Sequence, residues 1–139
     1  MLAYDIGTTG VKTCLLSIDQ TIELISSSQQ GYNLYILPDG GAEQDADQWW
    51  EAMCTTTKAI FTKTSVQPNQ IAALSFCSQM QGLVLVDKES QPVRRPMSYM
   101  DQRAGDQLRK GLAHGLQIAG ANVGKLLTSL RLTGAVSSS

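Results

Sequence analysis

Residues 2–18 read LAYDIGTTGVKTCLLSI, and this stretch decides the fold because two strand-like runs flank one glycine-bounded turn. The first run is short and apolar, and in the second the side chains alternate between two faces. A second turn signal and a run rich in β-branched residues follow directly. Three consecutive antiparallel strands are therefore predicted. They are expected over Leu2–Ile6, Val11–Ile18 and Thr21–Ser26, with turns at Gly7–Gly10 and Asp19–Gln20.

A helix is predicted after the loop that contains Pro38, Gly40 and Gly41. Asp45 with Gln48 three residues later has the form of a capping box, so the helix should begin there. Apolar residues then recur at helical spacing and predict a stripe that packs on a sheet. The stripe comprises Trp49, Trp50, Met53, Thr57, Ile60 and Phe61, and Pro68 ends the pattern.

The next segment returns to strand signals. Ile71 to Cys77 is a near-continuous apolar run, which is typical of a central strand buried on both faces. Two more strands are predicted at Gly82–Asp87 and Pro96–Met100, joined by a turn at Lys88–Pro92. Together with the first strands and the helix, they predict an α/β arrangement around a mixed sheet.

Beyond Asp101 the pattern is helical. A helical face is predicted from Leu108, Leu112, Leu116 and Ala119, although Gly111 and Gly115 weaken it. Asn122 is placed to cap a short helix through Leu130, with Gly134 as its stop. His114 has no partner in a recognisable triad, so it is assigned no role.

Length and composition exclude several classes of protein. At 139 residues the chain is long enough for one domain with a core, and a net charge of −1 gives no basic footprint for nucleic acid. Cys14, Cys54 and Cys77 are odd in number and form no C-x-x-C pair, which argues against a disulfide framework or a zinc site and favours small buried side chains. With no leader-like start and no apolar stretch of about 20 residues, a cytoplasmic protein without a membrane partner is expected.

The turn between the first two strands has the chemistry of a phosphate site. Gly7 and Gly10 allow the backbone to bend towards an anion, and Thr8 and Thr9 add hydroxyl donors beside the turn amides. A carboxylate at the end of the first strand, Asp5, can hold a hydrated Mg²⁺, because that ion takes few carboxylates and keeps several waters. Lys12 adds a cationic donor for the same phosphate. An ordinary hairpin turn with a capping aspartate is the alternative interpretation.

Three further motifs lie downstream. They are GAEQD followed by Trp49-Trp50 (residues 41–50), SQMQG (residues 78–82) and YMDQRA (residues 99–104). With the hairpin, they resemble the FGGY carbohydrate kinases, within the superfamily that includes actin and the seventy-kilodalton chaperones. The resemblance covers nearly the whole chain, and it implies a ribonuclease-H-like mixed sheet that here forms an incomplete domain. Gln81 stands where xylulose kinases commonly have histidine, which leaves the identity of the sugar open.

The resemblance also implies roles for residues. MgATP would be held by Gly7, Thr8, Thr9, Gly10 and Lys12, with Asp5 binding Mg²⁺ through water. A sugar, with ketopentoses such as xylulose first and other polyols next, would contact Met80, Gln81, Gly82 and Asp101. The tryptophans and Arg103 have structural alternatives: the indoles suit simple packing, and Arg103 suits a brace for Asp101. Arg94-Arg95 is expected to be a solvated surface pair.

The chain is expected to be the sugar-side, N-terminal part (residues 1–139) of a longer kinase, with the ATPase domain and the catalytic base absent. No catalytic residue is therefore assigned. Bare apolar surface should favour self-association, and a homodimer of the full-length protein is allowed. Two other classes compete with this hypothesis: an actin-type scaffold that uses the same hairpin, and a stand-alone nucleotide- or sugar-binding regulatory module.

Overall fold

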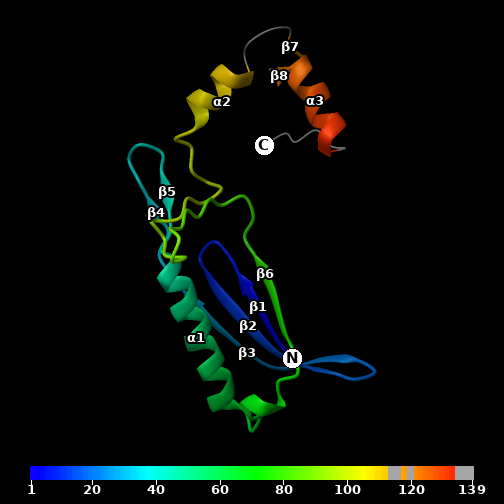
Figure 1. The fold of residues 1–139 in the computed structure, drawn as a ribbon. Coiled ribbons are helices and arrows are strands. Elements are labelled where there is room, and N and C mark those ends of the chain that lie inside the picture. Colours follow the sequence, from blue (N-terminus) through cyan, green and yellow to red (C-terminus); the bar gives the residue numbers. More distant parts are fainter. Residues whose placement is uncertain (113–116, 119–120, 134–139) are drawn as a thin grey trace. The chain divides into compact units, whose positions relative to one another are not determined.

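The computed structural model describes residues 1–112, 117–118 and 121–133 (Figure 1). The contacts between residues divide the chain into two compact units, Met1–Asp101 and Gln102–Ser139, and each unit is described by itself. The first unit contains the sheet, the long helix and all of the predicted site residues.

A four-stranded mixed sheet with the order β3-β2-β1-β6 forms the body of the first unit. β1 (Leu2–Ile6), β2 (Gly10–Ile18) and β3 (Ile22–Gly31) are consecutive and antiparallel, whereas β6 (Leu74–Ser78) pairs with β1 in parallel. The predicted three-stranded meander is therefore confirmed. β3 runs on to Gly31 instead of ending at Ser26, because its polar second half still pairs with β2 as far as Gly10.

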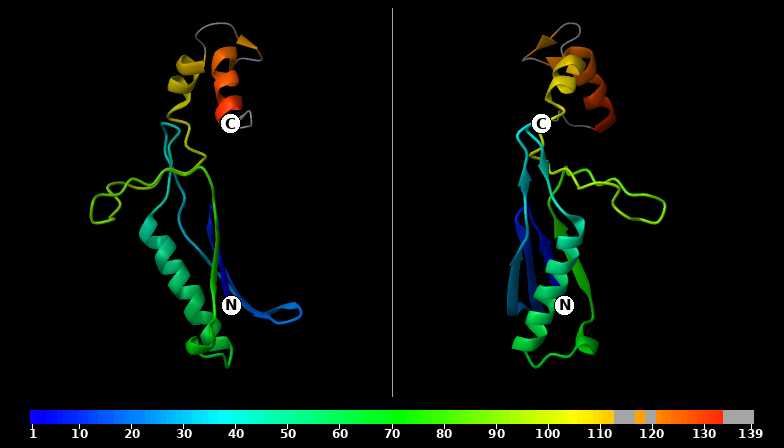
Figure 2. Two further views of the ribbon diagram at one scale, coloured as in Figure 1. Left: turned by 45° about the vertical axis from the view of Figure 1, so that its right-hand side comes forward. Right: turned by 90° about the vertical axis from the view of Figure 1, so that its left-hand side faces the viewer.

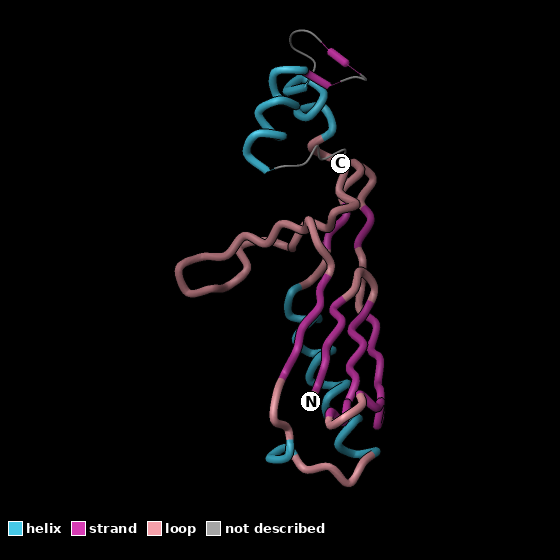
Figure 3. Tube along the Cα trace, turned by 90° about the vertical axis from the view of Figure 1, so that its right-hand side faces the viewer, coloured by secondary structure: helices cyan, strands magenta, loops and turns pink. Residues whose placement is uncertain are grey.

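Helix α1 (Ala46–Lys63) lies along one face of this sheet, as Figure 3 shows. The sheet side chains that it covers are Leu2, Tyr4, Val11, Thr13 and Leu15, all of them buried. The helix presents Ala52, Thr56 and Ile60, which are spaced by four residues and also buried. The hydroxyls of Thr13 and Thr56 are 2.7 Å apart and bond to each other inside this layer. Small side chains and paired hydroxyls thus bring the helix close to the sheet.

Two predictions for this helix need correction. Asp45 is the N-cap and accepts a hydrogen bond from the Asp47 amide at 3.0 Å, but Gln48 does not complete a capping box. The Gln48 side chain instead accepts from the Asn33 amide and donates to the Tyr35 hydroxyl. The buried stripe also excludes Trp50, which is 66% exposed, because Ala52, Thr56 and Ile60 occupy the sheet-facing positions.

Strand β6 is an edge strand, so the prediction of a central strand buried on both faces is wrong for this chain. A 3-10 turn at η1 (Pro68–Gln70) leads into it. Every residue of β6 is exposed, because β6 lies at the edge of the sheet and β1 is its only partner among the described strands. Phe76 stacks on Tyr4 with ring centroids 5.2 Å apart. Cys77 is exposed for the same reason, whereas Cys14 and Cys54 are partly buried.

The segments 82–87 and 96–100 are not strands, although they pair as a ribbon that projects from the sheet in Figure 2. Leu83 and Met97 exchange two backbone hydrogen bonds of 2.9 Å, and Asp87 and Ser90 form the turn at the tip. Pro92 and Pro96 lack amide donors, which interrupts a regular ladder. Met97 also bridges to Glu43, which belongs to the short hairpin of β4 (Tyr35–Ile36) and β5 (Ala42–Glu43).

The second unit contains α2 (Gly105–Leu112), β7 (Gln117–Ile118), β8 (Ala121–Asn122) and α3 (Val123–Thr133). The predicted helical character is confirmed, and Asn122 directly precedes α3. The predictions that concern His114, Gly115, Leu116, Ala119 and Gly134 lie outside the described residues. Among the described helices, none has the length and apolar character required to cross a membrane.

The packing of α1 gives a stability prediction. Ile60→Ala should lower the free energy of unfolding by about 2–5 kcal/mol, because Ile60 is 0% exposed and its removal leaves a cavity. Trp50→Ala, on the exposed side, should cost less than about 1 kcal/mol. Urea unfolding followed by circular dichroism measures both variants. A larger loss for Trp50→Ala than for Ile60→Ala would contradict the helix register described here.

Candidate phosphate and substrate site

The predicted turn after β1 is a tight hairpin. The Gly7 amide donates to the Gly10 carbonyl at 2.9 Å, and the register places Asp5 opposite Lys12. Gly10 has a reason to be glycine that sequence reasoning did not find. A Cβ atom at this position would lie 2.6 Å from the Gln30 carbonyl oxygen, so β3 approaches too closely for any side chain. The close approach of β3 therefore requires glycine at this position.

A cavity of about 340 Å³ joins this turn to the end of β6. Because β1 and β6 are parallel, their carboxyl ends reach the same edge of the sheet, where ligands bind in open α/β folds. The Gln79 amide extends the ladder by donating to the Ile6 carbonyl at 2.8 Å. The cavity is lined by Asp5, Gly7, Thr8, Ser78, Gln79, Met80, Gln81 and Tyr99.

The structure thus brings five of the predicted site residues to one cavity and leaves the others outside its lining. Asp5, Gly7 and Thr8 from the phosphate side meet Met80 and Gln81 from the substrate side. Thr9 and Lys12 are exposed, and Lys12 lies beside Asp5 across the β1–β2 pair. The remaining three predicted residues, which do not line this cavity, are Gly10, Gly82 and Asp101.

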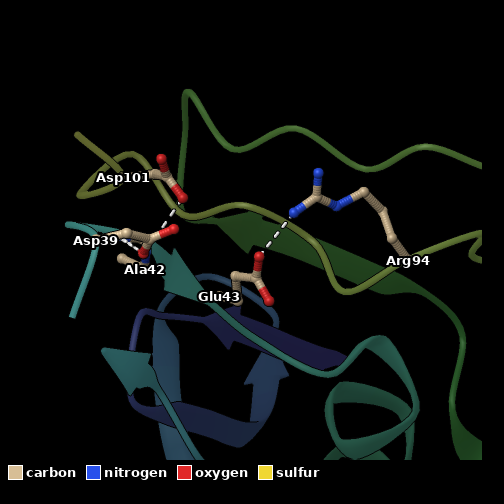
Figure 4. Close-up of polar contacts among 6 residues, drawn as sticks. Asp39, Ala42, Glu43, Arg94 and Asp101 are labelled. Atoms are coloured by element: carbon tan, nitrogen blue, oxygen red, sulfur yellow. Dashed lines mark hydrogen bonds and ion pairs between the residues drawn. The ribbon is translucent and has the colours of Figure 1, made fainter. Parts of the chain in front are cut away.

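Asp101 holds backbone instead of lining the cavity. Its carboxylate accepts from the Ala42 amide at 3.1 Å (Figure 4), and the Ser98 amide donates to the Ala42 carbonyl at 2.8 Å. The alternative of a helix cap does not apply, because α2 begins only at Gly105. Asp101 therefore ties the segment after Met97 to β5.

Arg94 and Arg95 are both exposed, as predicted for a surface pair, but each also contacts a partner side chain. Arg94 forms an ion pair of 2.7 Å with Glu43 (Figure 4). Glu43 itself is buried. The guanidinium of Arg95 lies 4.0 Å above the Tyr35 ring centroid, in a cation–π contact. Both arginines fix the projecting ribbon against the β4–β5 hairpin.

On the substrate side, the backbone of Gln81 is in a rare conformation. Its φ is 62°, in the left-handed region that few residues other than glycine adopt. Its neighbour Met80 is 80% exposed and presents its side chain at the cavity. Residues held in such conformations are often found at functional sites.

Two residues that hold the turn were not assigned to the site from sequence. The Tyr32 hydroxyl donates to the Gly7 carbonyl, and the Tyr32 amide donates to the Thr9 carbonyl at 3.2 Å. Gln44 donates from Nε2 to the Thr8 carbonyl. Tyr32 follows a polar strand and Gln44 precedes a helix cap, so no periodicity distinguishes either residue.

Tyr32 is also linked electrostatically to the site. Partial burial raises the pKa of its phenol to about 12, and the nearby Asp5 carboxylate adds to the rise because it disfavours a second negative charge. A raised pKa means that the folded protein holds this proton more tightly than the unfolded chain does. The stabilisation is complete below about pH 10 and is lost as the pH rises towards 12.

We expect Tyr32→Phe to flatten this alkaline dependence. In the parent chain, thermal stability should fall between pH 10 and 12, and one tyrosine should ionise with a pKa of about 12. The variant should lack both features, and it should lose about 1 kcal/mol at pH 8 with the bond to the Gly7 carbonyl. Ultraviolet titration and melting curves at pH 8, 10 and 11 measure these effects. Tyr99→Phe is the control, and an unchanged slope for Tyr32→Phe would contradict the assignment.

Comparison with known proteins defines the class. Residues 1–119 match the model of the "FGGY family of carbohydrate kinases, N-terminal domain". The chain belongs to this family, as the sequence motifs predict. This membership favours a kinase over an actin-type scaffold.

Individual relatives include kinases named for different substrates. The chain is 32% identical to a xylulose kinase of Staphylococcus epidermidis over 79% of its own length, and 33% identical to a glycerol kinase of Alteromonas mediterranea over 78%. It spans only 22% of the length of each of these relatives. The solved structure of gluconate kinase from Lactobacillus acidophilus superposes with a TM-score of 0.73 at 23% identity, covering 97% of this chain and 25% of that one. The fold is thus the ribonuclease-H-like mixed α/β fold of sugar kinases, and the predicted fold class is confirmed.

Proposed function

We propose that this chain forms the sugar-side, N-terminal part of an ATP-dependent carbohydrate kinase. The observation that carries the proposal is the cavity in which Asp5, Gly7 and Thr8 face Met80 and Gln81. A kinase has to place a phosphoryl donor and a hydroxyl acceptor next to each other. One wall of this cavity has the donors that suit phosphate, and the other has the mixed apolar and amide groups that suit a sugar.

The phosphate side would act by positioning and by neutralising charge, which dominate phosphoryl transfer. The amides and hydroxyls of Thr8 and Thr9 would bind the polyphosphate, and Lys12 would add a positive charge. The described residues contain no cluster of three or more metal-binding side chains, so they do not suit a metal ion that is coordinated by protein ligands alone. One exposed carboxylate, Asp5, suits a Mg²⁺ that keeps its waters and binds phosphate oxygens.

The substrate side would recognise a small polyol. Met80 can lie against a carbon skeleton, and the Gln81 amide can both donate to and accept from hydroxyls. Gly82 and Asp101 are proposed to complete this side from the adjoining segments. The relatives named xylulose kinase and glycerol kinase support a ketopentose or a related polyol as the acceptor.

We expect the 139-residue chain alone to show no sugar-dependent ATP turnover. The general base that activates the sugar hydroxyl is proposed to belong to the remainder of the kinase. The carboxylate that lines this cavity, Asp5, is proposed to bind Mg²⁺ instead. A coupled assay for ADP release with xylulose, glycerol and gluconate measures the activity. Turnover above the sugar-free blank would contradict this expectation.

Binding to the two walls can be tested separately on the isotope-labelled chain. Magnesium tripolyphosphate should shift the amide resonances of Gly7–Gly10, whereas xylulose or glycerol should shift those of Met80–Gly82. Asp5→Asn should weaken tripolyphosphate binding at least about fivefold in the presence of Mg²⁺ and much less in its absence.

The matched control is Asp19→Asn, at the exposed turn between β2 and β3, which should change nothing. Tripolyphosphate shifts that are absent from the Gly7–Gly10 turn, or that spread evenly over the surface, would rule out the proposed phosphate site.

A further inference from the structure

We propose that Gln44 is a positioning residue that orients the phosphate turn and connects it to the substrate wall. This inference rests on the proposed function and assigns a role to a residue outside the cavity lining. The Gln44 side chain donates to the Thr8 carbonyl at 2.5 Å and accepts from Gln79 Nε2 at 2.5 Å. Thr8 lies in the turn after β1, and Gln79 lies directly before Met80.

Gln44 is held firmly enough to act in this way. It is 1% exposed and ranks among the largest fully buried side chains. The backbone N–H of Gln44 donates to the Pro96 carbonyl at 2.9 Å, which fixes the backbone at this residue. A buried primary amide is unfavourable unless its donors and acceptors are satisfied, and an apolar side chain would fill the same space. The side-chain bonds to Thr8 and Gln79 therefore account for a polar residue here.

The direction of this hydrogen-bond chain is set by the turn. The Thr8 carbonyl can only accept, so the group of Gln44 that faces it has to be the amide nitrogen. The Gln44 oxygen then faces Gln79, which in turn has to present its own nitrogen. Gln79 Oε1 is left buried without a partner among the described residues. The Thr8 carbonyl thus fixes the orientation of both side-chain amides, that of Gln44 directly and that of Gln79 through Gln44.

Three consecutive carbonyls of the turn are held by scaffold donors. The Gly7 and Thr9 carbonyls accept from Tyr32, and the Thr8 carbonyl accepts from Gln44. In a trans peptide the N–H points away from the preceding C=O. Holding the Gly7 and Thr8 carbonyls inwards therefore turns the amides of Thr8 and Thr9 outwards. Neither amide has an acceptor in the described part of the chain, so both are available to an anion.

The same bonds couple the two walls of the cavity. Gln79 is tied to β1 through the Ile6 carbonyl, and the residues that follow it include Met80 and the left-handed Gln81. A ligand that shifts this segment also shifts the donor to Gln44, and hence the peptide that follows Thr8. A sugar on one wall is thus expected to change the affinity of the turn for polyphosphate.

The test uses amide resonances of the free chain, so it does not require ligand binding. Gln79→Met removes the donor to Gln44 without touching the turn, and it should still shift the Thr8 and Thr9 amide resonances. In a Gln44→Met background the same substitution should have no effect on them, which is a double-mutant cycle. Gln20→Met, at the exposed turn between β2 and β3, is the control.

Affinity provides the second readout. Gln44→Met should weaken tripolyphosphate binding at least about tenfold and abolish any effect of xylulose on it. Thr8 and Thr9 resonances that are unchanged by Gln79→Met, or changed equally in both backgrounds, would overturn the role of Gln44. If Gln44→Met does not fold, the response of the turn to Gln79→Met alone decides. The double-mutant cycle can show the connection between Gln79 and the turn even if the parent chain binds no tripolyphosphate. That combination of results would overturn the proposed function and leave the positioning role of Gln44 intact.

Discussion

The parallel pairing of β1 with β6 is the constraint on which the site depends. Among the described strands, β1 alone has partners of both orientations, because β2 runs antiparallel on one side and β6 runs parallel on the other. The antiparallel side produces a tight turn at the end of β1. The parallel side brings the end of a strand from more than sixty residues later to the same edge. A phosphate-type turn and a polar, methionine-containing loop are therefore brought together by backbone pairing.

Around this edge, polar side chains take over where the strands end. Residues 42–44 comprise the two-residue strand β5 and Gln44, and their backbone and side chains bond to the turn, to residues 96–98 and to Gln79. Asp101 also accepts from the Ala42 amide, and Arg94 donates to the Glu43 carboxylate. Hydrogen bonds between side chains and backbone thus hold a region that has little regular secondary structure.

The sequence was sufficient for the features that depend on local patterns. The hairpin turn, the N-cap at Asp45 and the presence of a strand after the helix follow from glycine spacing, a short polar side chain and an apolar run. The errors concern long-range packing. Trp50 fits a helical stripe as well as Ala52 does, and only packing in the buried cluster that includes Val11 and Leu15 selects the smaller residue. The exposure of β6, the ion pair of Arg94 and the bonds of Gln44 likewise depend on long-range packing, which no periodicity encodes.

The left-handed backbone at Gln81 restricts what evolution or design can place at the mouth of the cavity. At a φ of 62° β-branched side chains are disfavoured, whereas glycine, asparagine, aspartate and histidine are tolerated best. The repertoire of groups that can meet a substrate at this point is therefore mostly small or hydrogen-bonding, whatever the substrate. A change of acceptor preference through position 81 is confined to exchanges among polar side chains of different reach, and an aliphatic wall would first require the loop itself to be rebuilt.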